Sequence, residues 1–241
     1  HMTRLTDSCR VEWKLLRLHG SEVGRILGLG VPAGIQHMIF AVANLFIQVG
    51  INSFDSTVVS GNSAAVNVDN VIYNVMAAFY TACSTFMGQN WGAGKKDRMM
   101  KSYYISLGYS FAIAAVLGAA FLLCGEPFLY IFTNDADVVA AGMERMRIMC
   151  FSYCVSAFMD CTIAACRGIG RSFMPTVIVI MGSCVFRVAW IYTVFAHFHT
   201  IRSLYMLYPF SWVLTGAAEI AYFLYCYKKY VKPLDASHAA E

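Results

Sequence analysis

The sequence has few charged residues for its length, and this shortage excludes most soluble proteins. Asp, Glu, Lys and Arg make up 13% of the 241 residues, whereas roughly 25% is usual in a soluble domain. Residues 26–54, 70–94 and 102–125 contain none of the four. Each stretch can cross a bilayer core, because a helix of about 20 residues spans ~30 Å of hydrocarbon. A membrane protein is therefore indicated, and a secreted disulfide scaffold, a disordered tail and a soluble nucleotide-binding enzyme are not.

Motifs of soluble function are also missing. The nine cysteines form no CxxC pair and lie mostly in apolar runs, so we interpret them as small buried residues. Residues 88–98 resemble a phosphate loop only superficially, since five residues separate the first glycine from the Gly-Lys pair and no Ser or Thr follows. We interpret this stretch as a helix that ends at glycines, followed by a basic turn. No basic or aromatic stripe forms a groove, so no nucleic-acid partner is expected.

The apolar runs predict an all-α polytopic membrane protein with six transmembrane helices. The short alternating segments of a β-barrel are absent. We expect a cloning scar and basic interfacial linker at 1–26, a transmembrane lobe at 27–228 and a cytoplasmic tail at 229–241. The predicted helices lie near 27–51, 68–90, 103–125, 139–166, 174–197 and 203–227.

Lys and Arg gather in alternate connectors. The segment before the first predicted helix, the loops after the second and fourth, and the tail hold five, four, two and three of the 18 basic residues. The opposite connectors, 52–67, 126–138 and 198–202, hold Arg202 and several acidic residues such as Asp55. Because basic residues accumulate on the cytoplasmic side, we predict a multi-pass protein of the cell membrane with both termini in the cytoplasm.

Glycines occur beside a proline in the first predicted helix. Gly28, Gly30 and Gly34 flank Pro32 in an apolar run with no strand before it, which argues against a dinucleotide site. We expect these glycines to mark close packing between helices or a kink.

Three short motifs resemble one transporter family. Gly30-Val-Pro-Ala-Gly-Ile-Gln36 opens a predicted helix, Gly88-Gln-Asn-Trp-Gly-Ala-Gly94 closes the next, and Arg167-Gly-Ile-Gly-Arg-Ser-Phe-Met-Pro175 joins the fourth to the fifth. In this order and spacing, the motifs are similar to those in the second half of multidrug and toxin extrusion (MATE) transporters. The resemblance covers roughly residues 11–230.

This resemblance implies a twelve-helix antiporter made of two six-helix lobes, of which this chain supplies the carboxyl-terminal lobe. Such an antiporter exports organic cations or other amphiphiles in exchange for H⁺ or Na⁺, and needs no other cofactor. One lobe supplies only one wall of an alternating-access site. The expected partners are therefore the lipid bilayer, an amphiphilic substrate, and either the amino-terminal lobe or a second copy.

Polar residues form a stripe on the first predicted helix. His37, Asn44 and Gln48 share one face, and His37 lies near the middle of the membrane. His37 could couple to a proton, although a hydrogen-bonded packing role is favoured. Residues 26–54 lack the ion-binding carboxylate of some family branches, which by resemblance places the coupling site in the other lobe.

The second predicted helix has a polar and aromatic face. Asn70 and Asn74 lie beside Asp69 and Tyr73 at helical spacing. This face suits a cavity for amphiphilic cations, in which Tyr73 stacks and Asp69 supplies charge. Equally, Asp69 could be a solvated residue at the start of a helix in the outer interface.

Three further charged residues lie within apolar runs. Asp160 and Glu219 are expected at similar depths near the cytoplasmic side, where they could share a proton or pair with Arg167. A structural role is favoured for Glu219, and both roles stay open for Asp160. Arg187 is deeper, and we expect it to bind backbone carbonyls or a carboxylate such as Asp69.

Other functions have weaker support. A flippase of the same superfamily would need a strongly cationic cavity, and only Arg187 suggests one. A non-transporting structural half is a further alternative. No catalytic residues and no metal site are predicted, because the scattered histidines form no cluster and His197-Phe-His199 alone is a weak metal motif.

Overall fold

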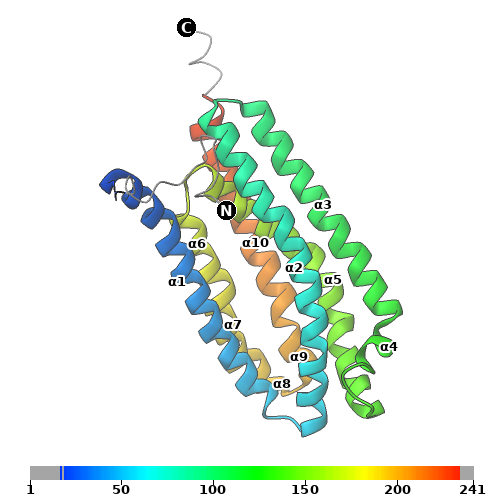
Figure 1. Cartoon of the computed structure of the whole chain (residues 1–241). Coiled ribbons are helices and arrows are strands. Elements are labelled where there is room, and N and C mark those ends of the chain that lie inside the picture. Colours follow the sequence, from blue (N-terminus) through cyan, green and yellow to red (C-terminus); the bar gives the residue numbers. More distant parts are fainter. Residues whose placement is uncertain (1–16, 18, 234–241) are drawn as a thin grey trace.

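The protein is helical throughout the part of the chain that the structure describes. The structure is a computed structural model that describes residues 17 and 19–233. These residues form helices and turns and contain no strand, and the long helices run alternately up and down a bundle (Figure 1). The predicted all-α class is confirmed.

The long helices are joined by short helices and turns, and after α5 a continuous helical rod alternates between α-helical and π-helical turns. The elements are α1 (Gly20–Ile51), α2 (Ser56–Gly92), α3 (Lys96–Leu123), α4 (Gly125–Leu129), α5 (Ala136–Gly168), α6 (Phe173–Val179), η3 (Ile180–Val185), α7 (Phe186–Trp190), η4 (Ile191–Phe195), α8 (Ala196–Phe198), α9 (Ile201–Tyr205), α10 (Leu207–Cys226) and η5 (Tyr227–Val231).

Four of the described helices are long and apolar enough to cross a membrane. They are α1, α3, α5 and the continuous rod Phe173–Phe198 that runs from α6 to α8. The long helices α2 and α10 are not among them. Both carry polar side chains within their length, such as Asn62 and Asp69 in α2 and Glu219 in α10. Composition therefore identifies four spans where six were predicted.

The helix α2 begins twelve residues before its predicted start, at Ser56 instead of position 68. The Asp55 side chain accepts a hydrogen bond from the Val58 backbone amide at 2.9 Å and caps this helix. Residues 56–67 are rich in small and polar side chains. An apolar-run criterion misses such a segment, because backbone hydrogen bonds and not hydropathy define a helix.

The turn after α2 agrees with the predicted glycine-rich helix end. The helix ends at Gly92 and α3 begins at Lys96. Between them Gly94 has a φ of 67°, a left-handed conformation that favours glycine. Gly170 has a φ of 78° in the corresponding turn between α5 and α6.

The expected linker and tail are only partly described. Residues 20–26 belong to α1, so the first helix begins inside the predicted linker. Residues 1–16 and 18 of the predicted scar and linker lie outside the described residues. In the tail, η5 continues the last helix to Val231, and residues 234–241 lie outside the described part.

The helix α5 occupies the centre of the bundle and contacts α2, α3 and α10. Small residues allow these helices to approach closely. A Cβ atom added to Gly61 of α2 would lie 2.6 Å from the Val138 carbonyl oxygen of α5, and one added to Gly168 would lie 2.5 Å from the Met87 Cβ. In contrast, Gly28, Gly30 and Gly34 have no such neighbour within 4 Å. The prediction that these three glycines allow close packing against another helix is therefore wrong among the described residues.

A second group of helices lies apart from α2, α3 and α5. In Figure 1, α1, α6 and α7 lie side by side, and α10 runs between this group and α2. The helix α1 packs on α6, η3 and α7, and it leaves large apolar side chains such as Leu45 and Val49 exposed. An exposed apolar helix face of this kind suits lipid or another helical lobe.

Candidate functional site

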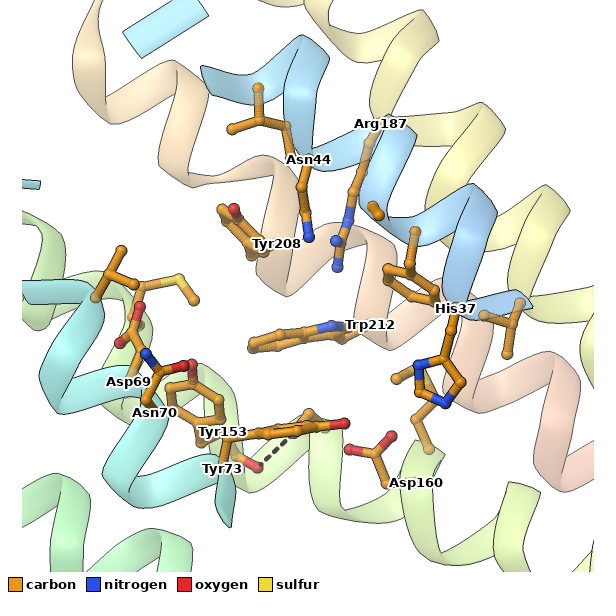
Figure 2. Close-up of a pocket in the computed structure, with 18 of the residues that line it drawn as sticks. His37, Asn44, Asp69, Asn70, Tyr73, Tyr153, Asp160, Arg187, Tyr208 and Trp212 are labelled. Atoms are coloured by element: carbon orange, nitrogen blue, oxygen red, sulfur yellow. Dashed lines mark hydrogen bonds between the residues drawn. The ribbon is translucent and has the colours of Figure 1, made fainter. Parts of the chain in front are cut away.

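A cavity of about 540 Å³ lies between the two groups of helices. Its walls come from α1, α2, α5, α7 and α10, together with Val179 at the end of α6. Figure 2 shows the side chains that point into it, with Trp212 between Arg187 and Tyr73 in the view. Of the predicted site residues, those lining the cavity are His37, Asn44, Gln48, Asp69, Asn70, Tyr73, Asp160 and Arg187.

The α1 stripe is brought to the cavity as its helical spacing predicts. His37, Asn44 and Gln48 line the cavity and are all exposed in this chain. Gln48 donates a hydrogen bond to the Asn52 side chain at 2.8 Å. His37 forms no side-chain hydrogen bond with the described residues. The favoured interpretation of His37 as a hydrogen-bonded packing residue is therefore wrong.

The α2 face is divided by the structure. Asp69, Asn70 and Tyr73 line the cavity, and the Tyr80 hydroxyl donates to the Tyr73 hydroxyl at 3.0 Å. Asn74 is exposed but is not among the lining residues. Its inclusion with the cavity residues was wrong. Asn74 follows Asn70 by about one helical turn, but the residues of α2 that line the cavity end at Tyr73.

Asp69 forms a buried ion pair that the sequence analysis missed. Asp69 and Arg145 of α5 are 6% and 4% exposed. The Asp69 Oδ2 accepts from Arg145 Nη2 at 2.6 Å and from Nε at 3.0 Å. Arg145 Nη1 also donates to Asn62 Oδ1 at 2.9 Å, and Tyr205 donates to the same oxygen at 3.3 Å. The signal available in the sequence was a basic and an acidic residue at similar depths in two of the predicted helices.

This pair corrects two expectations. Asp69 is not a solvated residue of the outer interface, and its partner is Arg145 and not Arg187. The pair joins α2 to α5 across one end of the cavity through Asp69 Oδ2, while Asp69 Oδ1 is buried without a hydrogen-bond partner among the described residues.

Arg187 lies on the opposite side of the cavity in an aromatic environment. It is 2% exposed, and its Nε donates to Ser211 Oγ at 3.0 Å. Its Cζ atom lies 4.7 Å from the ring centre of Tyr208, 5.4 Å from that of Phe40 and 6.0 Å from that of Trp212. Arg187 Nη2 is buried and has no hydrogen-bond partner among the described residues.

The two other intramembrane carboxyl groups occupy different places. Asp160 is half-buried and lines the cavity from α5. Glu219 of α10 is 0% exposed, does not line the cavity, and has no hydrogen-bond partner for either carboxyl oxygen among the described residues. The Arg167 side chain donates to Gln36 Oε1 at 2.7 Å and forms no ion pair in the described part of the chain.

The arrangement suits binding more than catalysis. Aromatic rings gather on α5 and α10, where Trp212 lies 5.4 Å from Tyr153 and 5.8 Å from Tyr208 between ring centres. Polar groups from α1, α2 and α5 face them across the cavity. Such apolar walls with a few placed polar groups are typical of small-molecule sites. The described residues contain no cluster of three or more His, Cys, Asp or Glu side chains that could hold a metal.

Comparisons with known proteins agree with this architecture. A probable multidrug resistance protein of Bacillus subtilis, YpnP, is 28% identical over 132 residues, which is 55% of this chain and 30% of that protein. An FAD transporter of Shewanella oneidensis is 22% identical over 136 residues, 56% of this chain and 29% of that protein. The chain thus matches about a third of the length of these relatives.

A solved structure has the same fold. A transporter of the MOP superfamily from Pyrococcus furiosus superposes with a TM-score of 0.81 at 16% identity, and the match covers 93% of this chain and 50% of that one. The family model MatE matches residues 32–193, within the range of the resemblance seen in the motifs. Because this match spans more than half of the sequence, the chain belongs to the MATE family of multidrug and toxin extrusion transporters.

Proposed function

We propose that this chain is the carboxyl-terminal lobe of a MATE exporter and forms one wall of its substrate cavity. The main support is the cavity itself, which lies between two groups of helices and exposes the polar residues Asn44, Gln48 and Asn70. An alternating-access transporter places its substrate at the interface of two such bundles. The match to half of a solved transporter chain supports the same division into lobes.

The proposal includes a membrane arrangement. The helices α2 and α10 cross the bilayer with the four apolar spans, because the lengths of 37 and 20 residues are sufficient. The basic turn between α2 and α3 and the end of α10 then face the cytoplasm, as do both termini. Of the polar side chains of α2, Asn62 and Asp69 bind Arg145 of α5, and Asn70 faces the cavity.

The substrate is an amphiphilic small molecule, either an organic cation or another amphiphile, and its export is coupled to H⁺ or Na⁺ entry. Aromatic side chains offer stacking, and Asp160 offers a carboxyl group in the cavity. The exposed apolar face of α1 supports a partner, which is an amino-terminal lobe or a second copy of this chain.

A second candidate is export of a molecule that carries negative charge, including a lipid-linked precursor. The FAD transporter of Shewanella oneidensis and the Pyrococcus furiosus protein, described as having a binding pocket of reverse polarity, are consistent with it. The cavity contains two arginines where the sequence analysis recognised one. Arg145 is neutralised by Asp69, however, so only Arg187 offers free positive charge.

Transport assays on a complete two-lobe assembly would test the proposal. The chain would be co-reconstituted with an amino-terminal MATE lobe, and ethidium movement would be followed under imposed H⁺ or Na⁺ gradients. Asn70→Trp places a large ring in the cavity and should lower the rate about tenfold or more, whereas Asn74→Trp, outside the cavity on the same helix, should not. Absence of gradient-driven movement, or equal rates for the two variants, would contradict the proposal.

A further inference from the structure

Arg187 is a buried cation of the cavity, and its Nη2 has no hydrogen-bond acceptor among the described residues. We propose that the cavity binds an acidic group of its ligand, a carboxylate or a phosphate monoester of an amphiphile, at the guanidinium of Arg187. This inference rests on the proposed function, because it takes the cavity to be a substrate site and names the class of ligand.

The guanidinium of Arg187 is held in one orientation. Its Nε donates to Ser211 Oγ at 3.0 Å, and the Ser211 hydroxyl donates in turn to the Tyr208 carbonyl oxygen at 2.9 Å. The rings of Phe40, Tyr208 and Trp212 surround the group. These contacts fix one edge of the guanidinium and leave Nη2 without an acceptor in the described part of the chain. A planar fork held in this way is suited to a carboxylate or phosphate.

Arg145 provides a comparison within the same cavity. All three of its nitrogens donate to acceptors on α2, two to Asp69 and one to Asn62. Arg145 therefore has its anion supplied by the protein. Arg187 is equally buried at 2% exposure but forms no ion pair with any described residue. Burying a cation without an anion costs free energy. Arg145 has its anion in Asp69, whereas Arg187 has none among the described residues.

The other charged groups of the cavity do not remove this need. Asp69, which lies across the cavity from Arg187 in Figure 2, is paired with Arg145. Asp160 and His37 face the cavity from α5 and α1, but neither bonds to Arg187. The cavity thus contains one cation without an ion-pair partner among the described residues and, at a separate place, one carboxyl group in Asp160. An amphiphile with an acidic group near its aromatic part satisfies Arg187, and an additional amine on the same molecule would face Asp160.

Equilibrium binding of matched probes would test the inference. The purified chain in dodecyl maltoside, a detergent without phosphate, would be titrated by calorimetry with 1-naphthaleneacetate, the neutral 1-naphthaleneacetamide and the cationic 1-naphthylmethylammonium. A separate titration with dihexanoyl phosphatidate would distinguish a lipid phosphate from a soluble aromatic acid. We expect the acetate to bind about tenfold or more tightly than the amide, a difference of about 1.4 kcal/mol or more, since hydrogen bonds between charged groups are stronger than those to a neutral amide.

Variants would assign the preference to Arg187. Arg187→Gln should remove the difference between acetate and amide, and Arg187→Lys should retain part of it because the charge remains. Arg98→Gln is the matched control, since Arg98 is exposed on α3 outside the cavity. Gel filtration would confirm that each variant is folded. Should Arg187→Gln fail to fold, Arg187→Lys carries the assignment, because its acetate-to-amide ratio should be smaller than that of the unchanged chain.

Each result has one meaning for the inference. Tighter binding of the acetate or phosphatidate that depends on Arg187 would support it. Equal affinity for all probes, preference for the ammonium, or no binding of any probe would overturn it. The transport assay above is independent, because ethidium movement blocked by Asn70→Trp would uphold the exporter proposal even if no acid bound at Arg187.

Discussion

The buried pair Asp69–Arg145 permits a quantitative prediction about stability. Replacing Asp69 by Asn keeps the shape of the side chain but removes the negative charge that receives two hydrogen bonds from Arg145. Arg145 would remain 4% exposed with a cationic guanidinium and only Asn62 as a full partner. Removal of one member of a buried pair typically costs about 3–5 kcal/mol. We expect Asp69→Asn to lower the free energy of unfolding by about 3 kcal/mol, since the amide oxygen retains one acceptor.

Unfolding in mixed micelles would measure this loss, with SDS added to dodecyl maltoside and helix content followed by circular dichroism. The double variant Asp69→Asn/Arg145→Met removes the unpaired cation as well. It should recover about 0.5–3 kcal/mol relative to Asp69→Asn alone, which is the range of coupling energies for residues in contact. Methionine fits between the rings of Tyr205 and Tyr208, which lie 5.2 and 5.4 Å from the Arg145 Cζ atom.

The exposed pair Arg202–Glu144 provides the control. Its side chains are 75% and 31% exposed, and such pairs contribute about 0–1 kcal/mol. Glu144→Gln should therefore have little effect. Equal losses for Asp69→Asn and Glu144→Gln, or a double variant less stable than Asp69→Asn, would refute the assignment of Asp69–Arg145 as the tie between α2 and α5.

Two further predictions use the same unfolding assay. The carboxyl group of Glu219 is fully buried without a hydrogen-bond partner among the described residues. Glu219→Met should therefore leave the free energy of unfolding unchanged or raise it by about 1 kcal/mol. A decrease of about 1 kcal/mol would show instead that Glu219 neutralises a charge. Gly61→Ala should cost about 1–3 kcal/mol, because the new Cβ would lie 2.6 Å from the Val138 carbonyl oxygen. In α3, a Cβ added to Gly108 would meet no atom within 4 Å, so Gly108→Ala should instead stabilise the protein by about 0.5–1 kcal/mol. Equal effects of the two alanine substitutions would contradict the packing of α2 on α5.

The cavity was predicted most successfully where helical spacing alone decides which side chains share a face. His37, Asn44 and Gln48 form one stripe in the sequence and line one wall in the structure. The same reasoning failed for Asn74, because a face several residues wide does not show where a neighbouring helix closes the cavity. Arg145 was missed altogether, since its role depends on α2 and not on its own helix.

The sequence alone determined the class of the molecule. Long runs without charge require helices in a membrane, because lipid offers backbone groups no other partner, and three short motifs in register were enough to indicate the family. Only the tertiary structure decided which charges are satisfied. Asp69 pairs with Arg145 across 76 residues, and Arg187 does not share this pair, because the approach of α2 to α5 at Gly61 sets which side chains meet.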